Sequence, residues 1–203
     1  MMKRAKISAT YRTISPTLQQ AEVDEPLPAR LTFFLDNRFT ATHERRIRSM
    51  LSTSFFRWME HFEARAEGEI SEFQTCANKY SRFNLAPVWF EEKIGNGAAA
   101  TDIMMNGFTT MFAANGFNRS AKAFIKYEIP KAGQNFTVKA TNGSNPETDS
   151  LTVTVNPKSL DRTDLSNTAL AGALWHAWMH RLGYRHPAGL YTSYFIGEVP
   201  MCI

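Results

Sequence analysis

Three of the five histidines of this chain, His176, His180 and His186, lie close together near its C-terminal end. His176 and His180 are four residues apart, so on a helix both imidazoles project from one face, about one turn apart. Gly183 is suited to a left-handed residue that ends the helix, after which the chain turns back and delivers His186. Three neutral imidazoles that converge from a helix and the following loop fit a tetrahedral zinc ion with one open position.

The residue after the first histidine is Ala177, at a position where a zinc hydrolase is expected to carry glutamate. A structural zinc site tends to be closed by four protein ligands, often cysteines, whereas this motif contains neither a cysteine nor a fourth histidine. The motif therefore indicates an open site without an adjacent carboxylate. The metal itself is inferred, because three imidazoles also accept other divalent ions.

The composition is typical of one globular domain with a well-formed core. The chain has 203 residues, of which 43% are hydrophobic and 21% charged, and it contains fifteen phenylalanines. The net charge is only +4, and the basic residues are scattered. Arg45, Arg46 and Arg48 are best explained as a solvated helix face, so we expect no nucleic-acid partner. The oligomeric state stays open.

The two cysteines, Cys76 and Cys202, do not define a disulfide framework. They are as compatible with one bridge as with two buried thiols, which leaves the compartment undecided. No apolar run approaches the roughly 18–20 residues that a bilayer span needs. The basic N-terminus is followed by polar residues and not by the apolar core of a signal peptide.

Hydrophobic periodicity predicts the elements that position the histidines. A strong amphipathic helix is expected over residues 42–68, with Thr42 as its cap, and a short helix or turn over 70–80. Alternation or short apolar runs predict strands at residues 31–35, 85–90, 123–129, 136–140 and 151–155. Residues 95–100 are expected to form a flexible loop, and periodicity does not decide whether 102–117 is helix or strand.

The histidines themselves fall on a second expected helix, which ends at Leu182. Asp164 or Ser166 can cap it, and Trp175 and Trp178 are expected to pack it against the sheet. The sequence therefore predicts a single α+β domain over residues 31–203, with a mixed sheet, a long N-terminal helix and a helix that carries two ligands. Residues 1–30 are polar and punctuated by prolines, and we expect an arm or leader there, with weak strand alternation at 7–14. His43 and His61 are interpreted as surface or hydrogen-bonded histidines and not as ligands.

Written as a pattern, residues 176–186 read H-x-x-x-H-x-x-G-x-x-H, which resembles the long zinc-binding signature of the metzincin metallopeptidases. His176, His180, Gly183 and His186 match that signature position by position. Met201 lies downstream, where the resemblance implies a methionine turn beneath the three imidazoles. The resemblance implies a zinc metalloendopeptidase that uses zinc-activated water on a protein or peptide substrate.

Ala177 departs from the family signature, which has glutamate there as general base for the zinc-bound water. Loss of this proton transfer costs a factor on the order of 10² to 10⁴ in rate. Two interpretations follow. Ala177 marks a Glu-to-Ala inactivated form of a peptidase, which the completeness of the remaining motif favours, or it is native in a natural pseudopeptidase that keeps zinc as a non-catalytic, zinc-stabilised binding domain.

Other residues near the motif carry weaker hypotheses. Tyr194 or Tyr191 is a candidate donor to the oxyanion, and Glu198 is a candidate replacement base, although nothing in the sequence fixes its direction. Arg181 and Arg185 flank the histidines and are read either as solvated cations at the helix end or as contacts for acidic substrate groups.

The order of the elements also suggests where a substrate lies and where the protein acts. Residues 151–155 are the hypothetical edge strand on which an extended substrate peptide lies. The small size and polar leader suit an excised bacterial effector or toxin domain, exported by a specialised secretion system.

Overall fold

The computed structural model describes residues 9–16, 30–117, 121–189 and 192–203. A five-stranded mixed sheet has the order β1-β2-β3-β5-β4. Its strands are β1 (Tyr11–Ile14), β2 (Phe33–Asp36), β3 (Phe124–Tyr127), β4 (Val138–Lys139) and β5 (Val153–Val155). Strands β2, β3 and β5 run parallel, whereas β1 and β4 pair antiparallel at the two edges. The predicted α+β class with a mixed sheet is confirmed.

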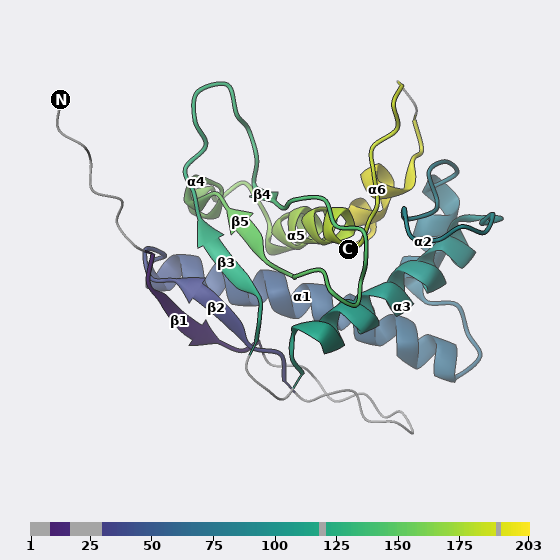
Figure 1. Cartoon of the computed structure of the whole chain (residues 1–203), viewed down its shortest axis with the longest axis horizontal. Coiled ribbons are helices and arrows are strands. Elements are labelled where there is room, and N and C mark those ends of the chain that lie inside the picture. Colours follow the sequence, from purple (N-terminus) through teal and green to yellow (C-terminus); the bar gives the residue numbers. More distant parts are fainter. Residues whose placement is uncertain (1–8, 17–29, 118–120, 190–191) are drawn as a thin grey trace.

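Helices cover one face of this sheet and extend beyond it. The helices are α1 (Ala41–Ala66), α2 (Glu72–Tyr80), α3 (Gly97–Asn115), α4 (Pro157–Asp161), α5 (Asn167–Arg181) and α6 (Phe195–Glu198), followed by the 3-10 helix η1 (Val199–Cys202). Figure 1 shows α1 and α5 behind the sheet, whereas α2 and α6 lie at the end away from β1. In the described part of the chain, no helix combines the length and apolar character required to cross a membrane.

The long helix α1 forms because its apolar residues recur every three or four positions and are buried on one side. Its cap is Thr40 and not Thr42, because the Thr40 hydroxyl accepts the N–H of His43 at 3.2 Å. The His43 ring returns a contact from its Nδ1 to the Thr40 N–H, which completes a capping box. The predicted helix over 42–68 is thus confirmed with a shifted start.

Trp178 of α5 is the centre of the aromatic core. Its ring lies 6.3 Å from that of Phe33 on β2 and 5.7 Å from those of Phe55 and Phe112. The indole N–H donates to the Leu151 carbonyl at 3.1 Å, so this buried polar group is satisfied. The predicted packing of Trp178 against the sheet is therefore confirmed.

Trp175 packs elsewhere, so its predicted contact with the sheet is wrong. Its ring lies 5.5 Å from Phe73 of α2 and 4.8 Å from Phe108 of α3. The two tryptophans are three residues apart, and they attach α5 to the sheet on one side and to the helices α2 and α3 on the other.

Hydrogen bonding corrects two local predictions, and it decides the secondary structure of a third region. Residues 85–90 form no strand, because the Val88 N–H donates to the Gly183 carbonyl and the Phe90 N–H to the Pro87 carbonyl, and neither donates to a neighbouring strand. The Trp89 indole N–H donates to the Leu182 carbonyl. Residues 97–100 begin helix α3, since the Asn96 side chain caps it. The region 102–117, left undecided by periodicity, is helical to Asn115.

Strand β5 is not an edge strand, because it pairs with β3 on one side and β4 on the other. The edge position predicted for residues 151–155 is taken by β4. At the opposite edge, β1 pairs with β2, which confirms strand alternation for Tyr11–Ile14. The rest of the predicted arm, residues 1–8 and 17–29, lies outside the described residues.

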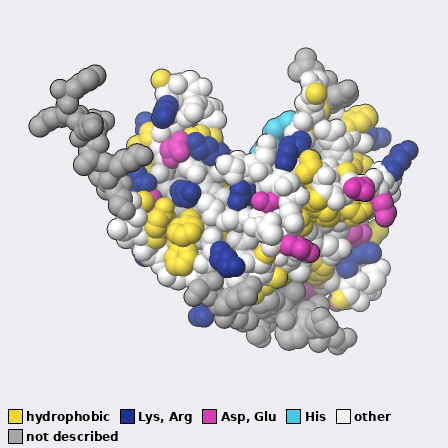
Figure 2. Space-filling view, viewed as in Figure 1, with side chains coloured by type: hydrophobic (Ala, Val, Ile, Leu, Met, Phe, Trp, Pro, Cys, Tyr) yellow, Lys and Arg dark blue, Asp and Glu magenta, His cyan; other side chains and the backbone are white. Residues whose placement is uncertain are grey.

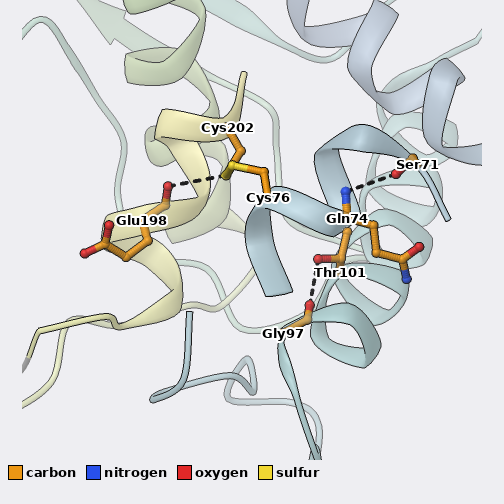
Figure 3. The surroundings of a disulfide bond; sticks show 7 residues. All are labelled: Ser71, Gln74, Cys76, Gly97, Thr101, Glu198 and Cys202. Carbon is orange, nitrogen blue, oxygen red and sulfur yellow. Dashed lines mark hydrogen bonds between the residues drawn. A yellow bond between two sulfur atoms is a disulfide. The ribbon is translucent and has the colours of Figure 1, made fainter. Parts of the chain in front are cut away.

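A disulfide between Cys76 and Cys202 settles the alternatives that the sequence left open. Figure 3 shows it between α2 and the turn at the C-terminal end of the chain. The two Cα atoms are 5.8 Å apart, and the half-cystines are separated by 126 residues in sequence. The bond therefore ties the C-terminal segment, which follows the histidine motif, to a helix from the N-terminal half.

Replacing both cysteines by serine is expected to lower the free energy of unfolding by about 2–5 kcal/mol, because the bridge closes a long loop in the unfolded chain. Urea denaturation of the double variant measures the loss. Wild-type protein treated with a phosphine reductant should unfold at the same urea concentration as the variant. Equal stability of the oxidised wild type and the variant would contradict this prediction.

Candidate metal centre

Two of the three histidines are positioned by the last two turns of α5. Ser166 caps this helix through its hydroxyl, which accepts the Ala169 N–H at 3.0 Å. The alternative cap, Asp164, pairs with the guanidinium of Arg162 instead. His176 and His180 therefore lie on the C-terminal half of a helix whose start and end are both defined by side-chain or backbone caps.

The helix ends in a Schellman motif, which turns the chain back toward His180. Gly183 has φ +103°, in the left-handed region that its sequence position predicts. Its N–H donates to the His180 carbonyl at 3.2 Å, and the Tyr184 N–H donates to the Met179 carbonyl at 2.9 Å. Met179 and Tyr184 are both buried, as the apolar contact of this motif requires.

The turn brings the three imidazoles together. One ligand nitrogen from each of His176, His180 and His186 lies within 4.8 Å of the other two. The ring centroids are 4.9 to 5.2 Å apart. Figure 2 shows histidine side chains in the surface hollow between the loop that joins β3 to β4 and the segment leading into α6. The structure thus assembles all three predicted ligands at a place that a small molecule or chain segment can reach.

The spacing of the nitrogens suits a tetrahedral ion. The Nε2 atoms of His180 and His186 are 3.2 Å apart. Two nitrogens bound to zinc at roughly 2.0–2.1 Å in tetrahedral geometry are separated by about 3.3 Å. His176 completes a set of three neutral nitrogen donors, which zinc and other borderline divalent metals accept. The donor set therefore fits a metal ion with at least one position left for another ligand.

The backbone carbonyl of Ile196 orients His176. Its Nδ1 lies 2.9 Å from the carbonyl oxygen of Ile196, so Nδ1 carries the proton and donates. This hydrogen bond leaves Nε2 with its lone pair free for a metal, which is the usual arrangement around a ligating histidine. His180 Nδ1 is buried and has no hydrogen-bond partner among the described residues.

Burial lowers the pKa of two of these imidazoles, those of His176 and His180. Burial lowers the pKa of His176, and the charge of His186 lowers it further. For His180, burial followed by the charges of His176 and His186 lowers the pKa to about 4. Metal binding requires deprotonated imidazoles, so the lowered pKa values of His176 and His180 favour the form of these two rings that binds a cation.

Ala177 faces the interior and adds no functional group to the site. Its side chain is 1% exposed. The metal-ligand cluster contains three histidines and no carboxylate, so Glu198 is not part of it. Figure 3 shows the Glu198 side chain pointing away from the disulfide. Among the described residues, no carboxylate joins the histidine cluster to replace the general base that is missing at position 177.

Tyr194, the candidate oxyanion donor, lies beside the three histidines. Its ring is 5.8 Å from the ring of His186 in an edge-on arrangement, and it also packs against the backbone of Gly197. A side chain added at Gly197 would meet the Tyr194 ring at 2.6 Å, so this glycine makes room for the tyrosine. Tyr191 lies outside the described residues.

Met201 does not lie beneath the imidazoles, and the predicted methionine turn is wrong. Its side chain is 78% exposed on η1. The interior next to the motif is filled instead by Tyr184 and Phe195, whose rings are 5.2 Å apart and fully buried. Sequence reasoning missed this pair, although an aromatic residue directly after Gly183 is a recognisable apolar contact of the Schellman motif.

Arg181 and Arg185 bind backbone carbonyls and are not free cations at the helix end. Arg181 donates to Ser150 and Thr141, and Arg185 donates to His180, Tyr184 and Gly143. The interpretation as solvated cations is therefore wrong for both residues, whereas a contact with acidic substrate groups stays a prediction.

The other two histidines, His43 and His61, form hydrogen bonds away from the metal cluster, as predicted. His43 Nε2 lies 2.7 Å from the carboxylate of Asp161. His61 is buried between the Ser71 hydroxyl and the Asp102 carboxylate, at 3.1 and 3.2 Å. Both rings link helices and stand apart from the metal cluster.

Comparison of the chain with protein-family models, with curated proteins and with solved structures finds no match in any of the three. The site is therefore interpreted from its own geometry.

The protein is expected to bind one zinc ion per chain, and His180→Ala should weaken binding by more than the 10- to 100-fold typical of outer-shell changes. Isothermal titration and elemental analysis after dialysis measure this. His43→Asn, which alters a histidine outside the cluster, is the matched control and should keep wild-type affinity. Wild-type affinity in His180→Ala would contradict a three-histidine centre.

Lowering the pH from 7 to 5 is expected to destabilise the metal-free protein. The pKa of His180 is about 4 in the folded chain, against an ordinary 6.5, so the unfolded chain binds more protons between these values. This contribution to stability is fully present above about pH 6.5 and is lost as the pH falls toward 4. Urea midpoints at several pH values should fall less steeply for His180→Ala, and identical slopes would argue against this assignment.

Proposed function

We propose that this chain is a zinc-binding domain of the metalloendopeptidase type, with the ligand arrangement of a metzincin and without its general base. The observation that supports this proposal best is the convergence of His176, His180 and His186 on a helix, a left-handed glycine and a return loop. The match in residue type and spacing to the metzincin signature is the second support. Zinc is the proposed cofactor, held by the Nε2 atoms of His176, His180 and His186.

Bound zinc would supply Lewis-acid chemistry that polarises a carbonyl and acidifies water. The chain's own residues divide the remaining tasks. His176 is oriented by the Ile196 carbonyl, and the Tyr194 hydroxyl is the proposed hydrogen-bond donor to substrate oxygen. Ala177 can neither accept nor return a proton. Peptide hydrolysis by the chain as written should therefore be slower by a factor on the order of 10² to 10⁴ than with a carboxylate at position 177.

A peptide substrate is proposed to lie along β4. This strand is the sheet edge nearest the histidine helix, and within the described residues it pairs only with β5. An extended segment can add to such an edge through main-chain hydrogen bonds, which need no particular side chains. The proposed substrate class is accordingly an extended protein or peptide segment.

The second candidate function is that of a natural pseudopeptidase, a zinc-stabilised binding domain in which Ala177 is native. The burial of Ala177 favours it, because a side chain that is 1% exposed contributes to packing and leaves no prepared space for a larger residue. On this interpretation, the surface hollow at the three histidines binds a partner chain without cleaving it. The two candidate functions share the metal site. They differ in whether Ala177 is native or replaces a glutamate.

The disulfide supports export, since stable bridges are typical of oxidising compartments and rare in reducing ones. Export by a specialised secretion system, as an effector or toxin domain, remains a hypothesis that agrees with this bond.

The two candidates are separated by restoring the carboxylate. Zinc-loaded Ala177→Glu is expected to cleave casein or a peptide library at least about 100-fold faster than wild type, because it regains a general base. Ala177→Gln has the same size and lacks the base, so it controls for packing and should stay inactive. No gain in the Glu variant, with zinc bound at one per chain, would overturn the peptidase proposal and leave the binding domain.

A further inference from the structure

The segment between β4 and β5, residues 141–150 and here called the clasp loop, lies against the end of α5. The Gly143 N–H donates to the carbonyl oxygen of His180 at 2.9 Å. A Cβ atom at position 143 would lie 1.8 Å from the Arg181 carbonyl oxygen, so the close approach requires glycine. The backbone of one ligand-bearing residue is thus in direct contact with a loop from the sheet.

Arg185 connects this loop to both sides of the metal motif. Its guanidinium donates to the His180 carbonyl at 3.3 Å, to the Tyr184 carbonyl at 3.0 Å and to the Gly143 carbonyl. Arg185 directly precedes His186 in sequence. One rigid planar group therefore holds the backbone of His180, the residues leading into His186 and the clasp loop in a fixed relation.

The clasp loop is itself anchored, so it can act as a reference point. The Asp149 carboxylate accepts the N–H groups of Ser144 and Asn145 at 2.5 and 2.7 Å. Asn115 of α3 donates to the Asp149 carbonyl at 3.0 Å. Arg181 binds Thr141 and Ser150, the two ends of the loop.

We propose that Arg185, acting through Gly143 of the clasp loop, is a positioning residue that sets the separation of the His180 and His186 ligand nitrogens. The inference rests on the proposed metal site and adds to it the group that fixes its geometry. The 3.2 Å spacing of the two Nε2 atoms depends on two backbone segments on either side of a turn. Arg185 bridges these segments, and outer-shell partners of this kind typically change metal affinity 10- to 100-fold.

Arg46 offers a matched control with the same chemistry in another place. Its guanidinium also donates to three backbone carbonyls, those of Leu160, Arg162 and Leu165. These carbonyls precede the N-terminal end of α5, whereas His180 lies near its C-terminal end. Losing the planar fork at position 46 therefore removes the same kind of backbone bridge without touching the metal motif.

The experiment compares Arg185→Lys with Arg46→Lys, because lysine keeps the charge and loses the fork. Zinc affinity is measured by competition with a chromophoric chelator, and ligand geometry by the visible spectrum of the Co²⁺-substituted protein. The stability of each metal-free variant is measured in parallel. Asp149→Asn, a milder loosening of the clasp loop, is included in case Arg185→Lys does not fold.

Arg185→Lys is expected to bind zinc 10- to 100-fold more weakly and to change the Co²⁺ spectrum, whereas Arg46→Lys keeps both at wild-type values even if its stability falls. Asp149→Asn should weaken zinc binding to a smaller extent. Wild-type affinity and spectrum in Arg185→Lys, or in a folded Asp149→Asn if Arg185→Lys is unfolded, would overturn the inference. Absence of stoichiometric zinc or Co²⁺ binding in the wild type would instead overturn the metal site itself.

Discussion

The free carbonyl groups at the C-terminal end of α5 are the constraint on which the site depends. A helix leaves its last carbonyls without partners inside the helix, and buried carbonyls need donors from elsewhere. Here the Met179 carbonyl accepts a hydrogen bond from the Tyr184 N–H. The His180 carbonyl accepts from three donors, which are the N–H groups of Gly183 and Gly143 and the guanidinium of Arg185. The Leu182 carbonyl accepts from the indole N–H of Trp89. Satisfying these groups brings together the return loop, the clasp loop and the segment around Trp89, and this assembly places His186 against the two helical histidines.

The parts of the site that the sequence predicts are those set by local geometry. The four-residue spacing of His176 and His180 fixes a shared helix face, and a glycine three residues after the second histidine allows the left-handed turn. Both features depend only on nearby residues, and the structure confirms both. The donors to the α5 carbonyls come instead from segments about 40 and 90 residues earlier (Gly143 and Trp89), and no local pattern indicates such pairings.

The wrong predictions share this origin. The apolar run at 85–90 has the composition of a strand. However, the Val88 N–H donates to the Gly183 carbonyl just after α5 and so does not enter a sheet ladder, and the Trp89 indole N–H donates to the neighbouring Leu182 carbonyl. Strand β5 is expected at the edge because it precedes the histidine helix in the sequence, yet β4, which lies before it in the chain, pairs along its outer side. Met201 occupies the position of a methionine turn in the sequence, while the disulfide holds η1 to α2 and the Tyr184–Phe195 pair fills the interior.

The residue at position 177 affects both catalysis and the stability of the fold. In the metal-free protein, a carboxylate at this buried position would lose hydration, and burial alone would raise the pKa of that carboxylate or destabilise the fold. His176, the preceding residue, offers little compensation, because burial lowers its pKa and so favours its neutral form. A bound divalent ion supplies that compensation. A glutamate at position 177 would therefore couple folding to the metal, whereas alanine at this position adds no charge that a metal must compensate.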